Sequence, residues 1–96
     1  MAVLRLTRFK TDPTDVEAML ERRAALIAAV RKSHPGLLQA QLAMADDETW
    51  IDAWRWDSRE SAQAAISNVP AIPEAGAAFA LTRDATAEFA DVVDER

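Results

Sequence analysis

The stretch from Thr49 to Ser61 constrains the fold of this chain most strongly, because it holds all three tryptophans, and the only other aromatic residues are three phenylalanines. In an extended backbone, side chains two residues apart point to the same face. The stretch has bulky or charged side chains at four such positions, which are Trp50, Asp52, Trp54 and Trp56. We therefore predict a strand with one indole-rich face and a carboxylate within that face.

A helix is predicted to follow this strand directly. Asp57 offers a carboxylate cap, and Glu60 stands three residues later, at the spacing of a capping box. The helix should begin at about Ser58 and stop before Pro70. Residues 71–82 are expected to add one or two short helical turns. Small apolar residues form a narrow face that favours close packing of the first of these helices onto a sheet, namely Ala62, Ala65, Ile66 and Val69.

A longer helix is predicted earlier in the chain. Asp12 followed by Pro13 indicates its start, because the carboxylate caps free amides and proline suits the first helical turn. The helix should run to about Ser33, since Pro35 keeps the preceding residue out of the helical region. Gly36 is expected to permit the chain reversal that follows.

Three further segments have the alternation that is typical of strands. The first is Val3–Lys10, in which we interpret Arg5 and Arg8 as solvated or ion-paired, because arginine is rarely fully buried. The second is Leu37–Ala45, which should form a hairpin with the tryptophan strand. The third is Ala85–Val93. In the second segment, four side chains should share one face: Leu38, Ala40, Leu42 and Met44.

The predicted order is strand, helix, strand, strand, helix, strand, which is the ferredoxin-like βαββαβ arrangement of the α+β class. Its antiparallel sheet carries the helices on one face. The strands here have apolar side chains on both faces, as with Leu4 and Leu6 on one side of the first strand and Val3 and Phe9 on the other. We therefore expect a second copy of the chain to cover the open face, which gives a homodimer.

Length and composition limit the functions that the chain can carry. With 96 residues we expect one domain, residues 1–96. The absence of cysteine excludes disulfides, thiolate metal sites and a cysteine nucleophile, and the single histidine excludes a multi-histidine metal site within one chain. The two glycines provide no glycine-rich phosphate loop.

Charge and hydropathy narrow the partners and the location. The formal net charge of -5 disfavours nucleic acid and anionic membranes as partners. The first ten residues interleave charged and apolar groups. We therefore expect neither a signal peptide nor a membrane span, and a cytoplasmic location.

Two polar residues interrupt the apolar stripe of the long helix. Arg23 projects near the middle of the stripe, and His34 would lie on the same line if the helix continued that far. Arg23 is either a stem that packs while its guanidinium reaches water, or a cation aimed into a cavity between helix and sheet. His34 is either a capping group near the helix end or a catalytic group. The stripe itself consists of Val16, Met19, Leu20, Leu26, Ile27 and Val30.

Arg23 and Asp52 form the one charged pairing that the sequence itself proposes. They lie on surfaces that we expect to face each other, and a lone buried charge would cost several kcal/mol. We therefore predict that the two groups lie within direct or water-bridged reach at the wall of a pocket.

Three parts of the chain together point to a known family. They are the opening strand, the helix end His34-Pro35-Gly36-Leu37 and the run Trp56-Asp57-Ser58-Arg59-Glu60-Ser61-Ala62. With these features the chain resembles the antibiotic biosynthesis monooxygenase family, within the dimeric α+β barrel superfamily, from Val3 to about Val93. The resemblance implies a homodimer whose two sheets form a barrel, with an apolar pocket between each sheet and its own helices. Some members oxygenate polycyclic phenols with O2 and no flavin or metal, some degrade haem, and many have no known activity.

The resemblance also bears on single residues. Trp56 matches a tryptophan that commonly borders the family's pocket. The histidine often found on the second helix falls at about Ala65 here. The first-strand asparagine of haem-degrading members has no counterpart among residues 3–9. The resemblance therefore does not extend to haem ligation by the familiar histidine.

We expect a cofactor-independent oxygenase that acts on a small aromatic or apolar molecule, without a bound cofactor or metal. Such an enzyme needs a dry cavity, a base, and a donor that stabilises the substrate anion. Trp54 and Trp56 are the candidate pocket walls and donors, Arg23 is the candidate anion holder, and Asp52 or His34 is the candidate base.

Other interpretations stay open. Tryptophans at alternate strand positions are equally consistent with core packing. The chain is alternatively a non-catalytic dimeric barrel that binds a hydrophobic metabolite, or an isomerase or lyase on the same fold that uses Asp52 or His34 as a proton carrier.

Overall fold

Strands and helices follow one another in the predicted order. The computed structural model describes residues 1–96, and its four strands form one antiparallel sheet in the order β2-β3-β1-β4. This order is that of the ferredoxin-like fold, so the predicted fold class is confirmed. The elements are β1 (Val3–Lys10), α1 (Val16–Ser33), β2 (Leu37–Met44), β3 (Thr49–Trp56), α2 (Arg59–Asn68), α3 (Pro73–Phe79) and β4 (Arg83–Asp91), with short 3-10 turns at Pro13–Asp15 and Val69–Ala71.

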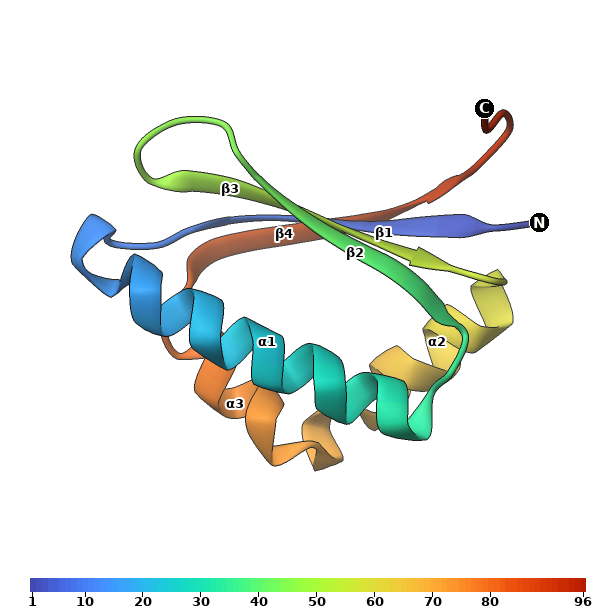
Figure 1. Ribbon diagram of the computed structural model, residues 1–96, viewed down its shortest axis with the longest axis horizontal. Helices are drawn as coiled ribbons and strands as arrows, with labels where there is room; N and C mark the ends of the chain where they lie inside the picture. The colour runs from blue at the N-terminus through green and yellow to red at the C-terminus, as the bar shows by residue number, and fades with distance from the viewer.

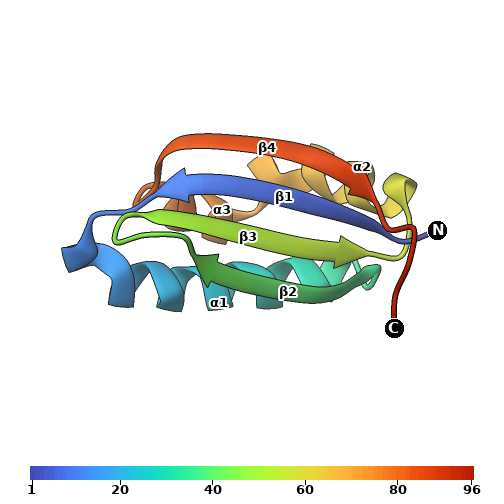
Figure 2. The same ribbon diagram turned by 90° about the horizontal axis from the view of Figure 1, so that it is seen from above.

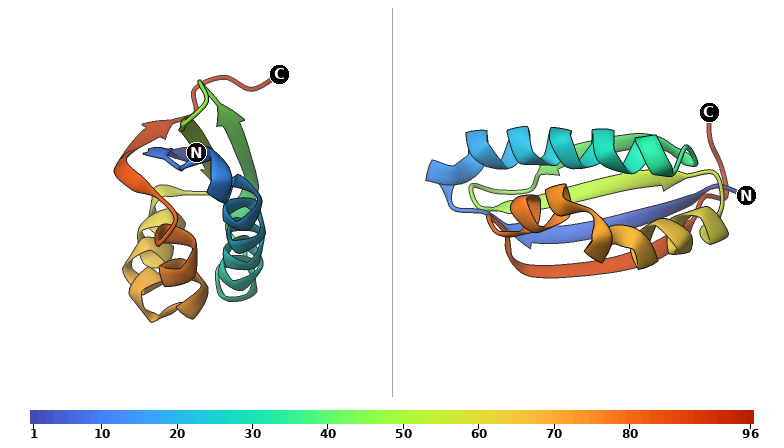
Figure 3. Two further views of the ribbon diagram at one scale, coloured as in Figure 1. Left: turned by 90° about the vertical axis from the view of Figure 1, so that its left-hand side faces the viewer. Right: turned by 90° about the horizontal axis from the view of Figure 1, so that it is seen from below.

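All three helices cover the same face of the sheet, and its other face is open (Figure 1). Seen from above, the open face shows β2 and β4 at its two edges (Figure 2). Seen from the end and from below, α1 runs under β2 and β3, while α2 and α3 lie under β1 and β4 (Figure 3). None of the helices combines the length and hydropathy that a membrane span requires.

The core lies between the sheet and the helices. Trp56 is its largest fully buried side chain, at 2% exposure. Alanines supply four of the nine buried residues, and all four lie on α2 and α3. The nine are Val3, Leu26, Val30, Leu37, Trp56, Ala62, Ala65, Ala75 and Ala78.

The cap of α2 differs from the prediction by one residue. Ser58 is the N-cap, because its Oγ accepts a hydrogen bond from the backbone N–H of Ser61 at 3.1 Å. Asp57 stays with the strand instead, since its backbone N–H donates to the carbonyl of Gly36 at 2.9 Å. The predicted cap at Asp57 is therefore wrong, although the helix begins close to where it was expected.

A bulge in β2 changes which leucine is buried. Leu37 pairs with Trp56 and Gln39 pairs with Arg55, so Leu38 is an extra residue on this strand. Leu37 is 4% exposed and Leu38 is 47% exposed. The prediction that Leu38 shares one face with Ala40, Leu42 and Met44 is therefore wrong, because one inserted residue breaks the alternation at this point.

The edges of the last strand also differ from the prediction. β4 begins at Arg83 and ends at Asp91, two residues before each predicted bound. Asp84 adopts a positive φ of 54° just after the strand begins. This local conformation, which β-branched and bulky residues avoid, is not visible in the alternation pattern.

Gly36 is needed for a close contact with neighbouring residues, not for a left-handed backbone conformation. No glycine has a positive φ. A Cβ added at Gly36 would lie 2.8 Å from Oδ1 of Asp57 and 2.9 Å from Cβ of Ser61. The chain reversal that joins α1 to β2 therefore depends on the small size of Gly36, which lets β2 lie against the start of α2.

We predict that Gly36→Ala lowers the free energy of unfolding by about 1–3 kcal/mol, because the added methyl group overpacks this contact. The matched control is Gly76→Ala in α3, where nothing lies within 4 Å of the added Cβ. There we expect no loss, and a gain of up to about 1 kcal/mol from helix propensity. Urea unfolding followed by tryptophan fluorescence measures both. Equal stability of the two variants would contradict this account of Gly36.

Candidate functional site

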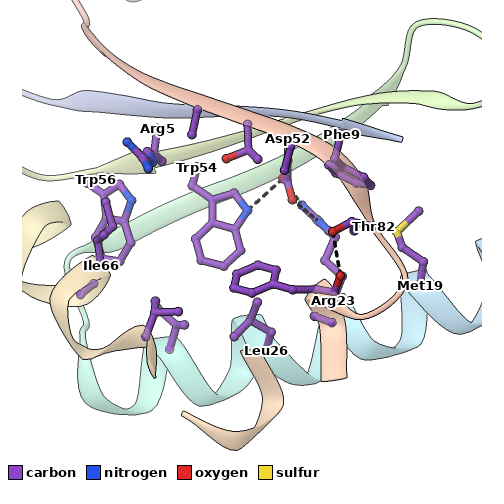
Figure 4. A pocket seen from close by; sticks show the side chains of 18 residues that line it. Arg5, Phe9, Met19, Arg23, Leu26, Asp52, Trp54, Trp56, Ile66 and Thr82 are labelled. Carbon is purple, nitrogen blue, oxygen red and sulfur yellow. Dashed lines mark hydrogen bonds and ion pairs between the residues drawn. The ribbon is translucent and has the colours of Figure 1, made fainter. Parts of the chain in front are cut away.

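A cavity of about 420 Å³ lies between the sheet and the helices. Thirteen of its 18 lining residues are hydrophobic, and they come from β1, β3, β4 and all three helices (Figure 4). Sites for small molecules are typically of this size, mostly apolar, with a few polar groups that orient the ligand. The cavity is therefore the candidate functional site.

Asp52 is the buried charge in the wall of this cavity, with 8% of the residue exposed. Its carboxylate accepts three hydrogen bonds, each of 2.9 Å. Nε and Nη2 of Arg23 donate two of them, and Nε1 of Trp54 donates the third (Figure 4). The predicted pairing of Arg23 with Asp52 is therefore confirmed, and it is direct and bidentate.

These three hydrogen bonds occupy most of the acceptor positions of the Asp52 carboxylate. A carboxylate has about four acceptor positions, so Asp52 retains about one. Arg23 in turn carries a positive charge that Asp52 compensates at close range. Held in this way, the pair is a fixed polar wall of the cavity rather than a free charge.

Trp54 and Trp56 line the cavity side by side, with ring centroids 6.5 Å apart and planes tilted by 37°. Their N–H groups differ. The indole N–H of Trp54 donates a hydrogen bond to Asp52, whereas Nε1 of Trp56 is buried without a hydrogen-bond partner. Trp56 also belongs to the core, so core packing and pocket lining both apply to it.

His34 lies apart from this group. Its backbone N–H donates to the carbonyl of Val30 at 2.8 Å, and its φ of -135° and ψ of 78° end α1 there. Its Nε2 lies 3.1 Å from Nδ2 of Asn68. His34 does not line the cavity, because the helical phase that would have placed it there stops one residue earlier.

Arg5, which was interpreted as solvated or ion-paired, is a charged residue of the lining that was not predicted to border the cavity. It lies opposite Trp54 in the β1–β3 register and lines the cavity. None of the five ion pairs involves Arg5. Instead, its Cζ lies 4.7 Å from the ring centroid of Phe89. The shared alternation of Arg5 with the buried residues Val3 and Phe9 is the signal that would have found it.

A haem group is a poor match for the residues that line this cavity. Haem iron is commonly held by histidine, cysteine or tyrosine, and the lining contains none of these. Ala65 lines the cavity at the position where the resemblance would have put a histidine. Met19 offers the only sulfur atom. The residues of this cavity therefore do not fit a haem group.

Comparison with known proteins gives one family and several similar folds. The family model described as antibiotic biosynthesis monooxygenase matches residues 2–69. No curated protein matches the chain. SnoaB from Streptomyces nogalater, described as a cofactor-independent oxygenase, is 20% identical with a TM-score of 0.73, over 98% of this chain and 95% of that chain.

Two other solved structures have a similar fold. Rv0793 from Mycobacterium tuberculosis is 22% identical with a TM-score of 0.71, over 99% of this chain and 98% of that chain. A mutant of MhuD with two manganese protoporphyrin IX molecules bound per active site is 24% identical with a TM-score of 0.69, over 98% of this chain and 97% of that chain.

The family match extends from β1 to the end of α2, and so covers well over half of the chain. It includes the two motifs, at residues 34–37 and 56–62, on which the sequence resemblance was based. The sheet order and the cavity between sheet and helices agree with the fold that this resemblance implies. The resemblance is thereby confirmed, and the chain belongs to the antibiotic biosynthesis monooxygenase family.

Proposed function

We propose that this protein is a cofactor-independent monooxygenase that oxidises a small hydroxylated aromatic molecule in the cavity. The observation that carries the proposal is the Asp52 carboxylate, oriented by Arg23 and Trp54 in the wall of an otherwise apolar cavity. Membership of the family and the likeness to SnoaB, described as a cofactor-independent oxygenase, support the reaction class.

Asp52 is the proposed base. Its remaining acceptor position can take the hydrogen bond of a substrate hydroxyl and then its proton. Arg23 and Trp54 are positioning residues in this scheme, because their donors fix the two carboxylate oxygens. We assign this role to Asp52 rather than to His34, since His34 does not line the cavity.

The overall reaction balances without an external reductant. A phenol with a hydrogen at the para carbon reacts with one O2 to give a quinone and one water. One oxygen atom forms the new carbonyl at the para carbon, and the other leaves with the ring and hydroxyl hydrogens. The substrate supplies all four electrons. The protein's part is to form the electron-rich phenolate and to keep water away from it.

The proposal includes a cytoplasmic homodimer that forms through the open face of the sheet. Leu4, Leu6, Ile51 and Ala53 are partly exposed there. A second copy would remove these apolar side chains from water, and a chain of 96 residues buries only a small core by itself.

Oxygen uptake with a panel of hydroxylated polycyclic compounds tests the reaction. We expect uptake with at least one of them, and mass spectrometry after reaction under 18O2 should show one labelled oxygen in the product. Asp52→Asn should lower kcat by about 100-fold or more, because it removes a general base but retains the shape. Asp47→Asn, at an exposed position in the β2–β3 turn, is the matched control and should leave kcat unchanged.

Two results would contradict this function. Compounds that bind without consuming oxygen would make the protein a carrier of hydrophobic molecules. Full activity in Asp52→Asn would remove Asp52 from the role of base.

Analytical ultracentrifugation tests the assembly. At micromolar concentration we expect a species of twice the 10.6 kDa chain mass, with an interface above about 1,000 Å² in total. Leu6→Glu, on the open face, should give folded monomers because it places a charge in the interface. Leu20→Glu, on α1 at 44% exposure, is the control and should remain dimeric. A wild-type protein that sediments only as a monomer would rule the dimer out.

A further inference from the structure

The two ends of the cavity have different electrostatic character. At the end formed by Arg23 and Asp52, each charge has a partner at 2.9 Å. At the other end, Arg5 lines the cavity with no carboxylate within ion-pair distance. Figure 4 shows Arg5 and Trp56 on one side of Trp54, and Arg23 on the other.

The register of the sheet brings Arg5 close to Trp56. Arg5 is directly opposite Trp54, and Val3 is directly opposite Trp56. Arg5 is therefore the diagonal neighbour of Trp56 on the inner face, within reach of long side chains.

Trp56 contributes a hydrogen-bond donor without a partner at this end. The residue is 2% exposed, and its Nε1 makes no hydrogen bond. A buried donor that stays unpaired costs about 1–3 kcal/mol. Trp56 lines the cavity, but this nitrogen is itself buried, so a ligand oxygen satisfies the N–H only when neighbouring side chains shift to admit it.

Neighbouring charges do not neutralise Arg5. Arg59 also lies against the ring of Phe89, with its Cζ 4.9 Å from the centroid. Arg59 itself is paired, because its Nη2 lies 3.1 Å from Oδ1 of Asp91. Arg5 thus keeps an uncompensated positive charge in partly buried, apolar surroundings, where an anion would be held strongly.

We propose that Arg5 and the N–H of Trp56 form an anion subsite that binds the carboxylate of an aromatic acid. The aromatic body of the ligand lies along Trp54, between this subsite and Asp52. The subsite also defines the substrate class, and only this statement rests on the proposed function: the substrate is a hydroxyaryl carboxylic acid. Its hydroxyl group faces Asp52 and its carboxylate faces Arg5.

Two probes with the same ring system test the subsite by isothermal titration calorimetry at neutral pH. The probes are 2-naphthoate, which is anionic, and 2-naphthalenemethanol, which is neutral. We expect the wild-type protein to bind 2-naphthoate at least about tenfold more tightly, because charge-assisted hydrogen bonds contribute on that order. Neither probe is a phenol, so the result does not depend on any reaction with oxygen.

Variants assign the preference to Arg5. Arg5→Met keeps the packing of the stem and should bind the two probes with nearly equal affinity, whereas Arg5→Lys should retain part of the preference. Arg59→Gln is the matched control, because Arg59 contacts the same ring but does not line the cavity; it should keep the full preference. Circular dichroism and thermal melting establish whether each variant is folded. If Arg5→Met does not fold, the partial loss of preference expected in Arg5→Lys carries the test.

Several results would overturn the subsite. Equal binding of the two probes by the wild-type protein would do so, as would an unchanged preference in Arg5→Met. A loss of preference in Arg59→Gln as large as that in Arg5→Met would show general surface electrostatics instead. Failure of the oxygen-uptake experiment would leave a positive result here intact, so the two proposals fail separately.

Discussion

The bidentate ion pair between Arg23 and Asp52 is the interaction on which the rest of the site depends. It joins the middle of α1 to the middle of β3, across a layer in which most of the other side chains are apolar. A carboxylate at 8% exposure would be strongly destabilising alone. The three hydrogen-bond donors offset the cost of burying this charge. Their geometry also fixes α1 and the indole of Trp54 relative to the sheet.

The same interaction helps to explain why a cavity is present where a core would be expected. At this point α1 and β3 meet through a guanidinium and a carboxylate, whereas Leu26 and Val30 of the same helix pack into the core. The alanines of α2 and α3 fill little of the remaining space, and about 420 Å³ is left. The polar groups then lie at the walls of an apolar space, which is the arrangement of a small-molecule site.

Local patterns in the sequence were sufficient for most of the fold. The bounds of β1 and the end of α1 agree with prediction, because alternation and the Pro35 signal act over a few residues. The predicted cap of α2 was wrong by one residue. The backbone N–H of Asp57 pairs with the carbonyl of Gly36, which lies in a distant part of the chain, and Ser58 caps the helix. The bulge at Leu38 was missed for a similar reason: register depends on the partner strand.

The candidate site was only partly predictable. Arg23 and Asp52 could be paired from the sequence, because each interrupts an apolar face and the two faces had to meet. Arg5 could not be recognised as unpaired, since that depends on which carboxylates lie near it, and Asp91 is taken by Arg59. His34 was a candidate only if the helical phase continued past Ser33, and α1 ends at Ser33 as predicted.

A double-mutant cycle tests the central claim most directly, that the pair is a built part of a ligand site. Arg23→Met, Asp52→Asn and the double variant would be compared for unfolding in urea and for binding of 2-naphthol. The account predicts a coupling energy of about 1–3 kcal/mol in stability, and weaker naphthol binding in both single variants while they remain folded. Additive losses of stability, with naphthol binding unchanged in every variant, would contradict it.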